Sequence, residues 1–234
     1  GKSANIVFDD ANIDHALDGA ISGIFAATGQ TCIAGSRLLL QSSIHDDFLK
    51  RLLDKVRGIR FGDPMNPKTQ VGPVTTKAQY DTILRYIDIA RKEGARCILG
   101  GNPAKQPEGI NGNFIEPTIF ADVTPKMRIA QEEVFGPVLA VLPFEDEDDA
   151  IAIANDVNYG LAAGIWTNDL TRSLKMADKL QAGTVWVNTY RSTSYTTPFG
   201  GYKLSGIGRE NGIEAIKEYT QTKSVWLSTA AKVA

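Results

Sequence analysis

The chain has 234 residues, of which 43% are hydrophobic, 8% aromatic and 22% charged, and its formal net charge is -2. This composition suits one large globular domain with a substantial core, and it disfavours an intrinsically disordered chain. Lysine and arginine total 25 against 27 acidic residues, and no apolar run reaches the roughly 20 residues of a membrane helix, so neither nucleic-acid binding nor membrane insertion is predicted.

In chain order, the first half alternates short apolar strands with amphipathic helices. Apolar residues recur at helical spacing in each predicted helix, and Gly94 is placed to end the last of them. The predicted strands are 5–8, 37–41 and 96–99, and the predicted helices are 12–27, 44–56 and 76–93. Two segments rich in glycine and proline, 62–73 and 100–113, are predicted surface loops.

The second half repeats this alternation. Residues 138–144 form a near-continuous apolar run, which is typical of a strand covered on both faces. Further strands are predicted over 162–167, 184–188 and 219–228, helices over 148–154 and 170–180, and a long loop over 189–209 with a short helix after it. The pattern predicts a three-layer αβα domain with a mostly parallel sheet.

The chain opens Gly1-Lys2-Ser3 without an initiator methionine or a signal-peptide pattern, and it enters an apolar run by Ile6. We therefore expect it to be part of a longer protein. Two cysteines make no disulfide framework and indicate a reducing compartment. Two histidines with two cysteines are too few and too scattered for a zinc site, so no metal is predicted.

Cys32 is the first candidate for chemistry. It follows Gly29-Gln30-Thr31 at the end of a predicted helix and precedes the small residues of Ala34-Gly35-Ser36. A thiolate is a strong nucleophile, and small neighbours would let a carbonyl group approach the sulfur and the adjacent backbone N–H. Free cysteines are also among the most buried residues, and the local sequence alone favours a core cysteine at both Cys32 and Cys97.

Glu132 and Glu133 stand before Val134-Phe135-Gly136-Pro137, at the entrance of the buried strand 138–144. Loops at strand ends of parallel sheets often carry ligands. A carboxylate there could accept hydrogen bonds from sugar hydroxyls, and Phe135 could flank a flat ring. Taken alone, a solvated acidic turn with an aromatic residue in the core explains this segment as well.

Two further segments are not predicted to form a binding site. The glycines of 198–212 do not have the spacing of a dinucleotide-binding fingerprint, and no strand precedes them. The acidic run 145–149 lies at a predicted helix start, where carboxylates favour the helix dipole, so a metal site is not predicted there.

Taken together, these segments indicate one protein family, although each of them alone does not. The whole chain resembles the catalytic domain of NAD(P)-dependent aldehyde dehydrogenases, because four motifs occur in the family's order at matching separations. They are Gly29-Gln30-Thr31-Cys32, Glu132-Glu133-Val134-Phe135-Gly136-Pro137, Tyr159-Gly160-Leu161-Ala162 and Pro198-Phe199-Gly200-Gly201-Tyr202-Lys203-Leu204-Ser205-Gly206. The resemblance implies an enzyme that oxidises an aldehyde to a carboxylic acid.

The resemblance implies the following chemical roles. Cys32 matches the nucleophile that forms a thiohemiacetal and then a thioester, and its backbone N–H would supply half of the oxyanion hole. Glu210 matches a carboxylate that assists a proton relay in some members.

The resemblance also implies binding roles. Glu133 matches the carboxylate that holds the nicotinamide ribose of NAD or NADP, and Phe135 matches an aromatic that packs near the cofactor. Phe199 falls where members line the substrate tunnel, and the loop 190–197 would shape specificity. Its polar side chains suggest a hydroxylated or charged aldehyde, although an exposed loop would have the same composition.

The rest of the family pattern concerns assembly and missing parts. Strand 219–228 resembles the family's oligomerisation strand, so a cytoplasmic homo-oligomer is expected. The chain begins at the end of the family's Glu-Leu-Gly-Gly-Lys motif, as Gly1-Lys2. The general-base glutamate, the oxyanion-hole asparagine and most of the cofactor domain would lie upstream, so this chain alone is expected to lack turnover.

Two alternatives remain open on the sequence. A CoA-acylating relative would resolve the thioester with CoA rather than water. A non-catalytic assembly module would use Cys32 only structurally.

Overall fold

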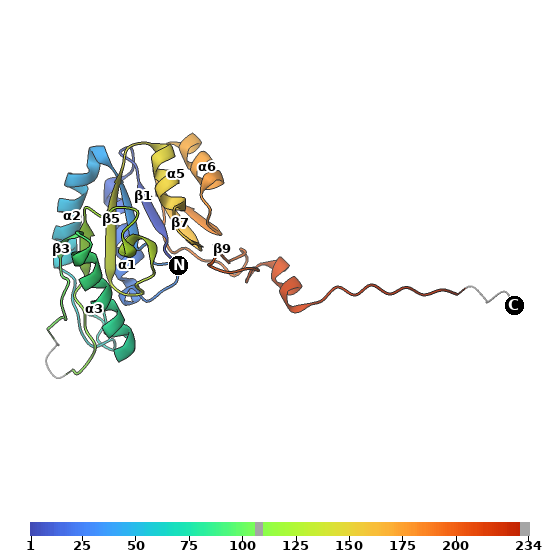
Figure 1. Cartoon of the computed structure of the whole chain (residues 1–234), viewed down its shortest axis with the longest axis horizontal. Coiled ribbons are helices and arrows are strands. Elements are labelled where there is room, and N and C mark those ends of the chain that lie inside the picture. The colour runs from blue at the N-terminus through green and yellow to red at the C-terminus, as the bar shows by residue number, and fades with distance from the viewer. Residues whose placement is uncertain (106–109, 230–234) are drawn as a thin grey trace.

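A seven-stranded sheet forms the centre of the protein. The computed structural model describes residues 1–105 and 110–229. The strand order is β3-β4-β5-β2-β1-β7-β8 (Figure 1). The strands are β1 (Ala4–Val7), β2 (Arg37–Gln41), β3 (Arg96–Leu99), β4 (Thr118–Ala121), β5 (Val138–Phe144), β7 (Ala162–Trp166) and β8 (Thr184–Val187). Within this seven-stranded sheet of the described residues only the pairing of β3 with β4 is antiparallel, so the predicted mostly parallel sheet is confirmed.

Helices cover both faces of the sheet. The helices are α1 (Ile13–Phe25), α2 (His45–Arg57), α3 (Lys77–Lys92), α4 (Arg128–Gln131), α5 (Glu147–Asn155) and α6 (Leu170–Lys179), with short 3-10 turns η1 (Ala26–Gly29), η2 (Ser42–Ile44) and η3 (Ile213–Tyr219). One apolar cluster joins α1 and α2 to one face, and a second joins α3, α4, α5 and α6 to the other. The predicted three-layer arrangement is therefore confirmed.

Side-chain caps set where four helices begin. Asn12, Thr76, Asp146 and Asp169 each accept a hydrogen bond from the backbone N–H three residues further on. Such caps satisfy N–H groups that have no partner within the helix. The acidic run 145–149 therefore belongs to the start of α5, in agreement with the interpretation from the sequence.

The structure contains three strands that the sequence analysis did not predict. β4 is a fully buried strand of four residues directly after Pro117, and its short apolar run has no alternation to mark it. β6 (Tyr159–Gly160) pairs with β9 (Tyr202–Lys203) in a separate antiparallel ribbon. This ribbon ties the long glycine-rich loop to the start of β7.

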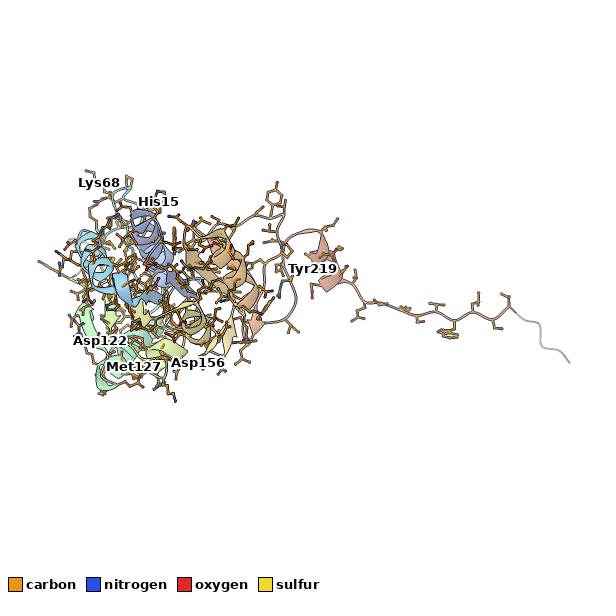
Figure 2. The ribbon with its side chains drawn as sticks, turned by 90° about the horizontal axis from the view of Figure 1, so that it is seen from above. His15, Lys68, Asp122, Met127, Asp156 and Tyr219 are labelled. Atoms are coloured by element: carbon orange, nitrogen blue, oxygen red, sulfur yellow. The ribbon has the colours of Figure 1, made fainter. Side chains whose placement is uncertain are left out.

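The strand predicted over 219–228 is not formed in the single chain. Tyr219 ends η3, and residues 220–229 run away from the domain as an extended segment without strand pairing (Figure 1). From above, the side chains beyond Tyr219 stand clear of the layers (Figure 2). A strand at this position needs a partner edge, so the prediction that it pairs across subunits stays a prediction.

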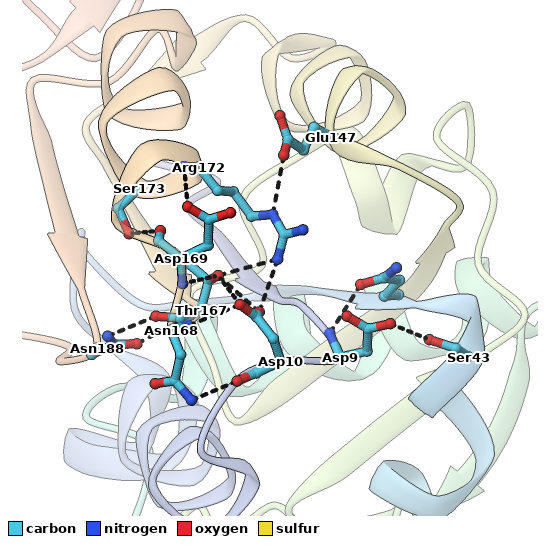
Figure 3. A network of polar contacts seen from close by, with 11 residues as sticks. Asp9, Asp10, Ser43, Glu147, Thr167, Asn168, Asp169, Arg172, Ser173 and Asn188 are labelled. Atoms are coloured by element: carbon cyan, nitrogen blue, oxygen red, sulfur yellow. Dashed lines mark hydrogen bonds and ion pairs between the residues drawn. The ribbon is translucent and has the colours of Figure 1, made fainter.

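A polar network closes the carboxyl end of the sheet beside β1 and β7 (Figure 3). The carboxylate of Asp10 accepts a hydrogen bond from the Thr167 hydroxyl at 2.8 Å and pairs with the Arg172 guanidinium at 2.9 Å. Arg172 also donates to Glu147 at 3.1 Å and lies over the Phe8 ring, 4.4 Å from its centroid. These contacts join the segments that follow β1, β5 and β7.

Arg37 holds β2 to the end of α5 from inside the protein. Its side chain is buried, and its guanidinium donates to the carbonyl oxygens of Lys2 at 3.0 Å, Ile153 at 2.8 Å and Ala154 at 2.7 Å. The last carbonyls of a helix have no partner within it, and a cation there also complements the helix dipole. Burial lowers the pKa of Arg37 to about 10, so the group remains charged at neutral pH.

We expect Arg37→Met to lower the free energy of unfolding by about 3 kcal/mol, because it leaves buried carbonyl groups without donors. Urea denaturation measures the change. Arg85→Met, on the exposed side of α3, is the control and should change stability by no more than about 0.5 kcal/mol. Equal effects of the two substitutions would contradict the role assigned to Arg37.

Candidate active site

Cys32 lies in an exposed turn between η1 and β2. Three consecutive residues before it adopt left-handed backbone conformations, with φ of 52° at Ala27, 58° at Thr28 and 68° at Gly29. Such angles are unfavourable for residues other than glycine and persist where surrounding contacts enforce them. The Thr28 hydroxyl donates to the Gly72 carbonyl at 3.1 Å, and the Gln30 side chain accepts from the Thr75 N–H at 3.1 Å.

Gly29 brings the Cys32 turn against the turn 133–137. A Cβ atom at Gly29 would lie 2.0 Å from the carbonyl oxygen of Gly136, so only glycine allows the two backbones to approach this closely. Two motifs separated by about a hundred residues in the sequence are thereby placed side by side.

Glu133 reaches the same place through Gly1. The backbone nitrogen of Gly1 lies within hydrogen-bond distance of the Glu133 carboxylate, whose side chain is 32% exposed. A Cβ atom at Gly1 would lie 2.7 Å from the carbonyl oxygen of Cys32. Gly1 therefore contacts both predicted site residues.

The neighbouring Glu132 has a different environment. Its carboxylate accepts hydrogen bonds from Arg128 at 2.8 Å and from the Tyr86 hydroxyl at 2.6 Å. These partners lower the pKa of Glu132 to about 2. Glu132 is therefore held against α3 and α4, whereas Glu133 faces the Cys32 turn.

Phe135 is held in an unusual conformation in the same turn. Its backbone φ is 55°, and 38% of the residue is exposed. Its carbonyl oxygen accepts a hydrogen bond from the Gln79 side chain at 3.0 Å. An exposed aromatic ring and a partly exposed carboxylate at Glu133 offer a surface for a flat ring and an acceptor for a sugar hydroxyl.

A cleft of about 630 Å³ opens beside Cys32. Cys32, Ile33, Trp186 and Phe199 lie on it, together with a group of hydroxyl side chains from the loop 189–197. That group is Ser192, Thr193, Ser194 and Thr197. No charged side chain of the described chain lines this cleft.

The loop after β8 differs from its predicted role at two positions. Tyr190 is 9% exposed and does not line the cleft. The guanidinium of Arg191 donates to the carbonyl oxygens of Ser22 at 3.5 Å and Ala26 at 3.3 Å, at the end of α1. The cleft therefore presents hydroxyl groups rather than the arginine charge.

Phe199 and Glu210 are joined by their backbones. The N–H of each donates to the carbonyl of the other at 2.7 Å, which folds the glycine-rich loop into a ribbon. Phe199 lines the cleft, but Glu210 does not, and the Glu210 carboxylate instead accepts a hydrogen bond from the Tyr219 hydroxyl at 3.3 Å. The proton-relay role of Glu210 stays a prediction.

The segments that carry Cys32 and Glu133 lie at the amino end of the parallel strands, but Glu133 and Phe135 do not line the cleft beside Cys32. The Gly1 segment precedes β1, the Cys32 turn precedes β2, the turn 133–137 precedes β5, and Gly183 precedes β8. Ligands of open parallel sheets commonly bind at the carboxyl ends, which the network of Figure 3 occupies here. Local sequence patterns cannot distinguish the two ends.

Two comparisons of the sequence place the chain among known proteins. A family model described as the aldehyde dehydrogenase family matches residues 1–225. The chain is 49% identical to a betaine aldehyde dehydrogenase of Mesorhizobium japonicum over 98% of this chain and 47% of that protein. It is 50% identical to one of Cereibacter sphaeroides over 97% of this chain and 46% of that protein. The chain thus spans about half the length of the curated relatives it matches.

Solved structures agree with the sequence comparisons. A Staphylococcus aureus betaine aldehyde dehydrogenase in complex with NAD+ superposes with a TM-score of 0.92 at 44% identity, over 94% of this chain and 43% of that chain. A variant of a Bacillus cereus aldehyde dehydrogenase superposes with a TM-score of 0.92 at 43% identity, over 97% and 45%. No helix in the described ranges has both the length and the apolar character needed to cross a membrane.

Proposed function

Because the chain belongs to the aldehyde dehydrogenase family, we propose that Cys32 is the nucleophile in the oxidation of an aldehyde to a carboxylic acid. The observation that carries this proposal is the exposed Cys32 thiol on a cleft shared with Phe199. Glu133 and Phe135 stand at the same end of the sheet, and the backbone of Gly1 lies beside both Glu133 and Cys32.

The chemistry begins with a bond between the Cys32 sulfur and the aldehyde carbon. The thiol first loses its proton to water, the thiolate sulfur supplies the electron pair, and the carbonyl π electrons move to the oxygen, which becomes the alkoxide of a thiohemiacetal. Among the described residues, no acceptor takes the backbone N–H of Cys32, so this group is free to donate to that oxygen. Water then cleaves the thioester that forms after oxidation, releasing the acid and the thiol.

NAD+ or NADP+ is the proposed oxidant, and when bound it supplies a hydride acceptor. Glu133 would accept hydrogen bonds from the ribose, and Phe135 would pack near the cofactor. Support comes from the partial exposure of both side chains and from the NAD+ complex of the S. aureus relative.

The cleft supports a small neutral or hydroxylated aldehyde as the substrate. Its described lining carries hydroxyl and aromatic side chains and no charged group. Because two relatives are named betaine aldehyde dehydrogenase, a quaternary ammonium aldehyde is the second substrate to test. Such a cation would have only the faces of Phe199 and Trp186 to pack on in this part of the site.

We also propose that the segment 220–229 pairs with a second copy of the chain. Its apolar side chains are exposed, with Val225 at 79%, Trp226 at 94% and Leu227 at 85%. Exposed apolar segments with free backbone groups favour pairing with another chain. The unpaired cysteines, Cys32 and Cys97, support a reducing location such as the cytoplasm.

We expect iodoacetamide to alkylate Cys32 at least about tenfold faster than Cys97, because the Cys32 residue is exposed and Cys97 is partly buried. The Cys97 sulfur contacts the carbonyl oxygens of Leu99 at 3.4 Å and Gly100 at 3.5 Å and is partly buried. Peptide mass spectrometry measures both rates in one sample. Acetaldehyde should slow the alkylation of Cys32 alone, because thiohemiacetal formation occupies the sulfur.

Cys97→Ser is the matched control and should leave the alkylation of Cys32 and its protection by acetaldehyde unchanged. Equal labelling of both cysteines, or labelling of Cys32 that acetaldehyde does not affect, would favour the non-catalytic assembly module.

A further inference from the structure

Tyr190 contacts the backbone beside Cys32 from a distant part of the chain. Its hydroxyl donates to the carbonyl oxygen of Ile33 at 3.1 Å, and Ile33 directly follows Cys32. The ring is buried and lies 4.8 Å from the ring of Trp186, which lines the cleft. Tyr190 is thus placed between the cleft wall and the turn that carries the thiol.

Three glycines make room for the Tyr190 ring. A Cβ atom would lie 3.2 Å from the ring at Gly23 of α1, 3.0 Å at Gly35 of the Cys32 turn and 2.5 Å at Gly164 of β7. These distances are shorter than ordinary van der Waals contact. The ring therefore fills a slot built by three separate elements, which fixes the place of its hydroxyl.

Arg191 adds a second connection to the same turn. Its guanidinium donates to the carbonyl of Ala26, before Cys32, while Tyr190 binds the carbonyl of Ile33, after it. The following residues, from Ser192 on, line the cleft. One segment therefore contacts the nucleophile turn on both sides and also forms the wall of the substrate cleft.

We infer that Tyr190 is a positioning residue, which holds Cys32 and its backbone N–H in place for aldehyde capture through the hydrogen bond to the Ile33 carbonyl. The inference rests on the proposed function, in which Cys32 is the nucleophile. Burial raises the pKa of Tyr190, so the hydroxyl keeps its proton and remains a donor under ordinary assay conditions.

Tyr190→Phe removes one oxygen atom and tests the inference. The control is Tyr195→Phe, a change in the same loop at a residue that is 86% exposed. The first readout is the acetaldehyde concentration that halves the alkylation of Cys32 by iodoacetamide. We expect Tyr190→Phe to raise it about tenfold, a factor that corresponds to about 1.4 kcal/mol, and Tyr195→Phe to leave it unchanged. The alkylation rate without aldehyde should change little, because the thiol is exposed in either case.

The second readout is amide hydrogen exchange by NMR at Ala34 and Gly35, whose N–H groups donate to Thr31 and Gly23. Tyr190→Phe should speed their exchange about tenfold and leave the amides of β5 unaffected. A general loss of stability would instead speed exchange in β5 as well. Gly35→Ala, which displaces the Tyr190 hydroxyl without removing it, should reproduce both local effects. This variant replaces Tyr190→Phe in the test if Tyr190→Phe does not fold.

The outcomes separate the inference from the proposed function. Wild-type protein that acetaldehyde does not protect would overturn the function, whatever the variants do. Protection in the wild type that is equal in Tyr190→Phe and Gly35→Ala, with unchanged exchange at Ala34 and Gly35, would overturn the role of Tyr190 alone.

Discussion

Purified alone, this chain is expected to produce no steady NADH from an aldehyde and NAD+, although Cys32 remains reactive. Hydride transfer requires the nicotinamide to be held within reach of the former aldehyde carbon, and such positioning is worth about 7–11 kcal/mol of the barrier. Glu133 and Phe135 are the two residues proposed here to hold the cofactor. The chain spans 47% of the length of a curated relative.

Release of the acid is expected to be equally impaired. A base beside the attacking water contributes about 10²–10⁴-fold, and Glu210 does not line the cleft. Loss of one oxyanion donor removes about 10²–10³-fold more.

NADH fluorescence, followed over several hours at a high protein concentration, tests this expectation. Faster labelling of Cys32 than of Cys97, and its protection by acetaldehyde, in the same preparation show that the turn is folded. Steady NADH production that Cys32→Ala abolishes would refute the expectation. Under those conditions, adding CoA would separate a hydrolytic from a CoA-acylating enzyme by its product.

Lys2 is expected to make the stability of the protein rise with pH. Its side chain is 2% exposed, and its ammonium nitrogen has no hydrogen-bond partner in the described structure. It borders a cavity of about 10 Å³, room for about one water molecule. Burial, with a further contribution from Arg37, lowers the pKa of Lys2 from 10.5 to about 7, against an opposing effect of Glu133.

The sign follows from the protons bound by each state. Between pH 7 and 10.5 the unfolded chain keeps the Lys2 proton and the folded protein does not, so the free energy of unfolding increases with pH. The slope is up to about 1.36 kcal/mol per pH unit. From pH 7 to pH 10 the gain is therefore up to about 4 kcal/mol, and below pH 7 the full destabilisation persists.

Urea denaturation of wild type and Lys2→Met at several pH values measures this contribution as a difference, in which other titrating groups cancel. We expect Lys2→Met to be the more stable protein at pH 6 and 7, with the difference narrowing toward pH 10. Lys50→Met, on the exposed side of α2, is the control and should run parallel to the wild type. A difference between wild type and Lys2→Met that does not depend on pH would contradict the assignment.

The local sequence determined most of the secondary structure. The strands predicted over 37–41, 96–99 and 138–144 have those same bounds in the structure, because apolar runs and helical spacing are properties of neighbouring residues. β4 was missed because a buried run of four residues after a proline carries no periodic signal. The predicted strand 219–228 differs for another reason, since a strand exists only where a second edge pairs with it.

The order of the motifs was also enough to identify the family. The family pattern then supplied the candidate residues, which are Cys32, Glu133, Phe135, Phe199 and Glu210. Their surroundings were decided by tertiary structure alone. The strand order places β5, β2 and β1 side by side, and this brings the turn of Glu133 and the turn of Cys32 together at the amino end. The burial of Lys2 and the contact of Tyr190 with Ile33 depend on the same packing. Contacts between residues more than a hundred positions apart are set by chain crossovers, which the pattern of neighbouring residues does not encode.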